Sequence, residues 1–109
     1  MTPAIIDKIQ RIVRCYPDPA PESATLPYSY YTYTRNAIHT KEGIAGYEGV
    51  LSVAVVAENK AQATTLSERI IDALNGKSFG DIVLLYSESS ESDMVDAGLS
   101  AIEINFNYF

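Results

Sequence analysis

Four carboxylate side chains in one short segment come closest to a chemical site in this sequence. They are Glu88, Glu91, Asp93 and Asp96, in residues 88–98 (ESSESDMVDAG), a segment without any basic residue. A pair of carboxylates can act as general acid and base, but nothing in this spacing requires it. A calcium loop would alternate acidic ligands and close on a glutamate, which this segment does not do. The simpler interpretation is a solvated acidic loop.

Nucleophilic catalysis has no visible basis in the sequence. It needs an activated serine, cysteine or threonine beside a base, whereas His39, the only histidine, stands alone in a glycine-containing stretch. No HExxH, Walker A or GxGxxG pattern occurs. Cys15 is the only cysteine, so neither an intramolecular disulfide nor a cysteine zinc site can form. We expect a protein of a reducing cytoplasm with no catalytic residue, no cofactor and no bound metal.

The charge and hydropathy of the chain limit its partners. Its 109 residues carry a formal charge of −6, which argues against a basic face that binds nucleic acid or anionic lipid. No apolar run approaches the roughly 18 residues of a membrane-spanning helix. Asp7 and Lys8 fall where a signal peptide would be apolar. We expect one domain, residues 1–109, with no membrane association.

The elements that must position these residues centre on residues 50–76. Val50 to Ala57 is an apolar run rich in β-branched residues, which predicts a strand. A helical pattern follows from Lys60 to Asn75, where Asn59 suits the N-cap and Gly76 the left-handed C′ position. The apolar face of this helix consists of Ala63, Leu66, Ile70, Ala73 and Leu74. A strand that leads directly into such a helix predicts a helix packed on a sheet.

The rest of the chain predicts a second helix and three more strands. Thr2 as N-cap and Pro3 at the first helical position begin a helix that should run to about Arg14. The proline-broken stretch from Tyr16 to Pro21 predicts an extended surface connection. The remaining predicted strands are Tyr28–Thr34, Phe79–Ser87 and Ser100–Phe109.

This order, α-β-β-α-β-β, predicts an α+β two-layer sandwich. One four-stranded, mainly antiparallel sheet would carry both helices on one face, and its other face would meet water or another subunit. Residues 36–49 contain Gly43, Gly46 and Gly49 and lack a strong apolar pattern. They predict a long loop that is mobile in the isolated subunit and becomes ordered on assembly.

Tyrosines occupy both faces of the strand that begins at Tyr28. Tyr28 and Tyr30 point one way, and Tyr31 and Tyr33 the other. The simpler interpretation is that the rings cover the edge of the core with their hydroxyls in water. The alternative is that one tyrosine face lies in a subunit interface, where tyrosine is enriched.

The order of these segments resembles that of a known group of proteins. An amino-terminal helix, a Tyr-Pro stretch broken by prolines, and Leu26-Pro27-Tyr28 opening a tyrosine-rich strand precede a glycine-containing loop. The strand Leu51–Ala57 and the helix Ala61–Leu74 follow. This order resembles the small tail-completion proteins of tailed bacteriophages and prophages, the lambda-type tail-terminator group. The resemblance spans nearly the whole chain, although its only motif-like part is Tyr-Pro…Leu-Pro-Tyr.

The resemblance implies a structural role and a set of partners. Proteins of this group assemble into a ring, usually a hexamer, that ends the tail tube and joins it to the head connector. The partners implied are further copies of the chain, the tail-tube protein and the head-connector protein, with DNA passing through unbound. The implied location is the bacterial cytoplasm during assembly and then the tail or neck of the virion. No catalytic residue is implied. Residues 88–98 have no counterpart that we know in the group.

Three functions are compatible with the sequence. The leading one is a ring-forming tail terminator, in which the acidic loop either lies on the outer surface or faces the lumen and repels DNA. The second is a small-molecule-binding regulatory α+β module, and the third is an enzyme subunit that uses the four carboxylates. Size in solution separates the first two, because a ring is a large symmetric oligomer and a sensor is usually a dimer. Metal titration would be the simplest indication of the third.

Overall fold

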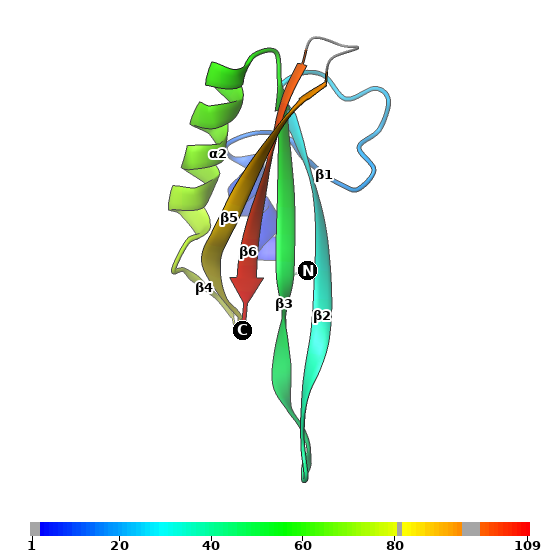
Figure 1. Ribbon diagram of the computed structural model, residues 1–109, viewed down its shortest axis with the longest axis vertical. Helices are drawn as coiled ribbons and strands as arrows, with labels where there is room; N and C mark the ends of the chain where they lie inside the picture. The colour runs from blue at the N-terminus through cyan, green and yellow to red at the C-terminus, as the bar shows by residue number, and fades with distance from the viewer. Residues whose placement is uncertain (1–2, 81, 95–98) are drawn as a thin grey trace.

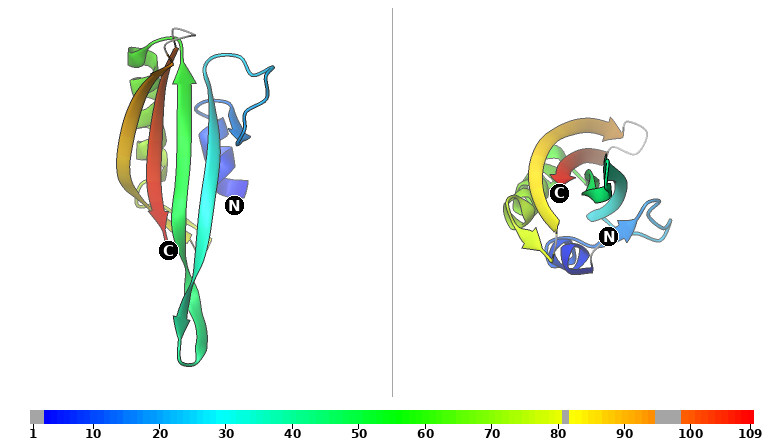
Figure 2. Two further views of the ribbon diagram at one scale, coloured as in Figure 1. Left: turned by 45° about the vertical axis from the view of Figure 1, so that its right-hand side comes forward. Right: turned by 90° about the horizontal axis from the view of Figure 1, so that it is seen from below.

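In the computed structural model, the described residues (3–80, 82–94 and 99–109, with the backbone only for 92–94) form two helices and a six-stranded sheet (Figure 1). The sheet order is β1-β2-β3-β6-β5-β4, with every neighbouring pair antiparallel except β1 and β2. The sheet curls around the helices (Figure 2). The elements are α1 (Pro3–Gln10), β1 (Cys15–Pro17), β2 (Tyr28–Thr40), β3 (Gly43–Ala57), α2 (Lys60–Leu74), β4 (Ser78–Phe79), β5 (Ile82–Met94) and β6 (Leu99–Tyr108).

The predicted two-layer sandwich, with its four-stranded sheet and the order α-β-β-α-β-β, is wrong, because the sheet has six strands and curls into a half-barrel. Two short edge strands, β1 and β4, complete the sheet, and the parallel pairing of β1 with β2 makes it mixed. Strands of two or three residues show no alternation that a sequence could reveal. Pro17, which lacks an N–H, is tolerated because β1 is an edge strand.

The predicted loop over residues 36–49 is also wrong. Strands β2 and β3 continue through it as a hairpin that closes where Thr40 pairs with Gly43. The Thr40 hydroxyl donates to the Gly43 carbonyl at 3.1 Å, and Gly43 has a φ of 120° that favours glycine. Ala45 is an unpaired residue where the register shifts. Both faces of this ribbon are largely solvated, so its sequence lacks the apolar alternation of a half-buried strand.

The core lies between the inner face of the sheet and both helices. Alternate residues of β3 and β6 point into it, and α1 and α2 pack on this same face. Neither described helix has the length and hydropathy to cross a membrane. The largest buried members of the core are Ile5, Ile9, Leu51, Val53, Val55, Ile70, Leu74, Leu84, Ile104 and Phe106.

The two helices begin and end for local reasons. The predicted caps of α2 are confirmed: Asn59 accepts a hydrogen bond from the Gln62 N–H at 2.8 Å, and Gly76 has a φ of 73°. The first helix ends at Gln10, earlier than predicted, and the Gln10 side chain donates a hydrogen bond to the Cys15 carbonyl and accepts one from the Cys15 N–H. Thr2, the predicted N-cap, lies outside the described residues.

The packing of α2 on the sheet predicts the cost of removing its buried side chains. Ile70 is fully buried and Leu66 is nearly so. We expect Ile70→Ala and Leu66→Ala each to lower the free energy of unfolding by about 2–5 kcal/mol, as for other deletions of buried aliphatic groups. Urea denaturation would measure this, with Arg69→Ala, an exposed position on the same helix, as the control. Losses below about 0.5 kcal/mol at both buried sites would contradict the packing.

Candidate functional site: an assembly surface

The strand register divides the four predicted interface tyrosines between two faces. Residues that pair directly across strands point to the same side. Tyr30 pairs with Ala54, so Tyr30 and Tyr28 point to the outer face, away from the helices, whereas Tyr31 and Tyr33 point to the inner side. The four rings therefore do not form one continuous surface.

The surroundings of these rings differ. The ring of Tyr31 packs against the core, and that of Tyr28 meets Tyr16 edge to face with centroids 6.5 Å apart. Tyr33 is 46% exposed and remains available for contact. Whether any of the four lies in a subunit interface stays a prediction.

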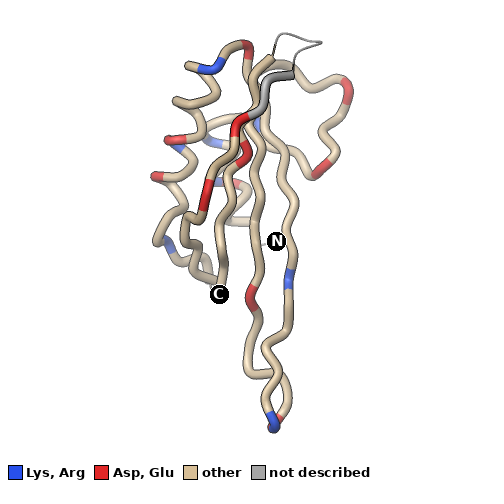
Figure 3. Tube along the Cα trace, in the orientation of Figure 1, with Lys and Arg blue, Asp and Glu red and all other residues tan. Residues whose placement is uncertain are grey.

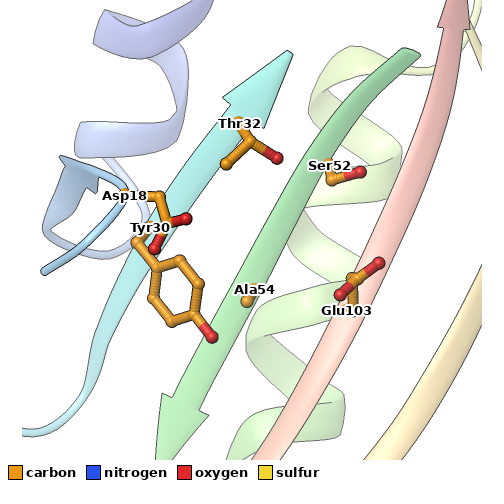
Figure 4. A pocket seen from close by; sticks show the side chains of 6 residues that line it. All are labelled: Asp18, Tyr30, Thr32, Ser52, Ala54 and Glu103. Atoms are coloured by element: carbon orange, nitrogen blue, oxygen red, sulfur yellow. The ribbon is translucent and has the colours of Figure 1, made fainter. Parts of the chain in front are cut away.

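A hollow of about 280 Å³ opens on the outer face beside Tyr30 (Figure 4). Figure 4 shows Asp18 and Glu103 on opposite sides of it, with Ala54 as its small apolar floor. Burial, followed by the negative charge of Asp18, raises the pKa of Tyr30. Small-molecule sites are mostly apolar and enclosed, so this open, polar hollow gives little support to a ligand-binding module. Its lining is Asp18, Tyr30, Thr32, Ser52, Ala54 and Glu103.

As far as Met94, the acidic segment belongs to strand β5 and is not the predicted loop. Glu88 pairs with Asn105 and points to the outer face. Glu91 pairs with Ile102 and points to the inner side, where its carboxylate lies 3.0 Å from the Lys60 ammonium. Glu88 and Glu91 thus diverge, which does not favour the paired acid and base of the enzyme hypothesis.

The other two predicted acidic residues are less fully described. Asp93 belongs to β5, and Asp96 lies outside the described residues. Among the residues whose side chains the structure describes, no group of three His, Cys, Asp or Glu residues could hold a metal ion. The buried Cys15 thiol lies in the core, where burial raises its pKa and so disfavours the reactive thiolate. A lumen-facing role for the acidic residues stays a prediction.

The most prominent surface feature is the part of the β2–β3 hairpin that extends past β6, residues 35–48, which we call the arm. Strand β6 pairs with β3 only as far as Gly49, and the arm continues alone (Figure 1), in a molecule measuring 52 × 24 × 23 Å. Ile44 is 55% exposed, and Ile38 and Tyr47 are also exposed. A two-stranded ribbon has little stability of its own in water, so these apolar side chains suit contact with another protein surface.

One face of the arm combines aromatic, apolar and cationic groups. The guanidinium of Arg35 stacks over the ring of Tyr47 at 3.7 Å from its centroid. The register places Ile44, paired with His39, on the same side as Tyr47, paired with Ala37. Sequence reasoning missed this surface because the unpaired Ala45 interrupts the two-residue period.

The base of the arm is joined to the body by Tyr108. Its hydroxyl donates a hydrogen bond to the carbonyl of Thr34, and its ring lies over Gly49, where a Cβ would collide with both. Burial raises the pKa of Tyr108, an effect that nearby Arg35 opposes. The neutral hydroxyl is the form that can donate this bond.

A second exposed apolar group lies on the outer face at the carboxyl end of β6. Val83 and Phe109 exchange backbone hydrogen bonds of 3.2 Å and are therefore a directly opposed pair. Leu85 pairs with Asn107 and points to the same face. Leu85 is 44% exposed and Phe109 is 54% exposed. We call Val83, Leu85 and Phe109 the outer patch.

The contact at the base of the arm predicts that substitution of two glycines by alanine has very different effects on the free energy of unfolding. We expect Gly49→Ala to lower the free energy of unfolding by about 1–3 kcal/mol, as for other overpacked sites, because the new methyl group meets the Thr34 carbonyl and the Tyr108 ring. Gly46→Ala, in the same hairpin but with open space around its Cβ position, should change it little. Thermal or urea unfolding of both variants measures the difference, and equal stabilities would contradict the close approach.

Comparison with known proteins gives a likeness at the level of structure. No known family model matches the sequence, and no curated protein sequence does. Among solved structures, a chain of the virion of the native gene transfer agent particle superimposes with a TM-score of 0.68. The match covers 97% of this chain and 83% of that chain at 18% sequence identity. At this identity the likeness shows a shared fold.

Proposed function

We propose that this protein is a structural component of a virion, specifically a tail-terminator or tail-completion protein. The observation that carries the proposal is the fold shared, over 97% of the chain, with a chain of the gene transfer agent virion. The resemblance of the sequence to the lambda-type group favours the terminator role within a virion. On this proposal, copies of the chain form a ring, a hexamer, that caps the tail tube and joins the head connector.

The surfaces of the described residues agree better with assembly than with the alternatives. The arm and the outer patch expose apolar side chains from two separate parts of the chain. The hollow beside Tyr30 is polar and open, and the carboxylates of Glu88 and Glu91 point to opposite faces. Neither arrangement favours a regulatory ligand site or an acid–base enzyme. The partners on this proposal are other copies, the tail-tube protein and the head-connector protein.

The acidic side chains of residues 88–98 are then candidates for the lining of the channel or its rim. Residues 88–98 contain four carboxylates and no basic residue. A basic lining would bind DNA phosphates and retard the passage of DNA, whereas an acidic lining repels them. Those of Glu88, Glu91, Asp93 and Asp96 that face the channel would therefore allow DNA to pass without binding.

The proposal predicts a closed ring in solution. We expect the purified chain, as its concentration is raised, to form one assembly with a mass six times that of the 11.9 kDa chain. Sedimentation velocity would measure the mass, and negative-stain electron microscopy would reveal rings of uniform diameter. A chain that remains monomeric, or a dimer that does not grow with concentration, would contradict the proposal, and the dimer would favour a regulatory module.

The channel lining predicts a salt-dependent effect on DNA passage. We expect particles carrying lysine at positions 88, 91, 93 and 96 together to eject DNA more slowly than the parent. The delay should be largest at low salt, where screening is weak.

The matched control carries lysine at four other acidic positions, so that the net charge changes by the same amount. These positions are all exposed, and three of them lie on the helices: Asp7, Glu22, Glu68 and Asp72. Ejection at the parental rate by particles with the first set, at low and high salt alike, would exclude a channel-facing position. Equal slowing by both sets would indicate an effect of net charge alone.

A further inference from the structure

We propose that the arm of one copy docks on the outer patch of the next copy, with Ile44 and Tyr47 against Leu85 and Phe109. This inference rests on the proposed function and adds to it the two surfaces that join neighbouring copies. Each copy would give its arm to one neighbour and receive the arm of another.

The first argument is the exposure of the arm within one copy. Beyond Gly49 the ribbon has lost its pairing with β6, and its described residues reach past the body of the molecule (Figure 2). Its apolar side chains remain exposed, Ile44 most of all. The Tyr108 hydroxyl and ring hold the base of the ribbon against the sheet. The arm is therefore an attached, projecting element with an apolar surface, which suits insertion against another molecule.

The second argument is the position of the outer patch. Val83, Leu85 and Phe109 point away from the face that packs on α1 and α2. Because they stand on paired strands, they form a preformed surface that would need no rearrangement to receive a partner.

The third argument is charge, and it favours a second copy as the occupant. Within the arm, Arg35 and Lys41 balance Glu42 and Glu48, so residues 35–48 are neutral and the formal charge of −6 resides in the rest of the chain (Figure 3). Two bodies of this charge repel each other, whereas a neutral arm can approach an acidic body.

The charges around the patch agree with this choice. The outer-face positions that the register assigns on β5 and β6 include Glu88 and Glu103 and, among the described residues, no Lys or Arg. The cations of the arm, Arg35 and Lys41, would therefore meet carboxylates near the patch rather than other cations.

The geometry of such a contact implies its symmetry. The arm and the outer patch are different surfaces, so their contact is heterologous and is repeated from copy to copy. A heterologous contact closes into a ring when its rotation allows and otherwise produces a filament. An arm-to-arm contact would instead stop at a dimer.

Two variants of the full-length chain test the contact, one on each surface. Ile44→Glu places a carboxylate on the arm, and Leu85→Glu places one on the outer patch. Each variant alone should require at least tenfold higher concentration to assemble than the parent. An equimolar mixture should form dimers and nothing larger. The intact arm of Leu85→Glu fits the intact patch of Ile44→Glu, and the arm and patch that remain free in each dimer both carry the added glutamate. Sedimentation velocity distinguishes monomer, dimer and ring.

The controls separate this contact from loss of folding and from charge. Thr65→Glu adds the same charge at an exposed position of α2 and should assemble as the parent does. Ile44→Val keeps an apolar β-branched side chain and should also assemble. Circular dichroism and the unfolding midpoint of each variant are compared with those of the parent, and formation of the mixed dimer itself requires both variants to be folded.

Each remaining outcome overturns the inference. The arm–patch contact is excluded if either glutamate variant assembles as the parent does. It is also excluded if a mixture of the folded variants stays monomeric, or if Thr65→Glu disrupts assembly equally. If the parent and both variants all form rings, the contact fails and the proposed function stands. If the parent itself never assembles, the proposed function fails together with the contact.

Discussion

Burial of one face of strand β3 is the constraint on which the rest of the structure depends. Leu51, Val53 and Val55 are completely buried against the helices, and over this stretch β3 pairs with β2 on one side and β6 on the other. Burial of such side chains is the main favourable contribution to folding. The positions of β2 and β6, and of the helices that cover the inner face, all follow from this strand.

The same strand has two different surroundings along its length. From Gly49 to Ala57 it is a central strand, and from Gly43 to Glu48 it is half of a two-stranded ribbon. Gly49 marks the transition, because only a residue without a Cβ allows the Tyr108 ring and the Thr34 carbonyl to come so close. The body thus contacts the arm at its base while leaving the apolar side chains of the arm exposed. The same two strands therefore contribute both to the buried core and to the projecting ribbon.

The elements that could be predicted from sequence are those whose signal is local. The helix α2 carries its own apolar stripe and its own caps, Asn59 and Gly76, and both were predicted correctly. Strand β6 alternates cleanly because one of its faces is buried, from Ile102 to Tyr108. In each case the residues that decide the structure are neighbours in the chain, so their spacing alone is informative.

The remaining features depend on contacts between distant residues. Residues Cys15 to Pro17 form a strand only because they pair with the edge of β2. The arm forms because β2 and β3 continue to pair with each other beyond the body. The candidate site was likewise only partly visible: the tyrosines and carboxylates were identified, but the register separated Tyr30 from Tyr31 and Glu88 from Glu91 onto opposite faces.

The sequence by itself determined the helix α2, the apolar core strands and the acidic character of the chain, because composition and short-range periodicity encode these features directly. Only the tertiary structure decided the number of strands, the extent of the arm and the grouping of Val83 with Phe109. The physical reason is that strand pairing joins residues far apart in the chain, and a shift of one residue in register moves every side chain to the other face.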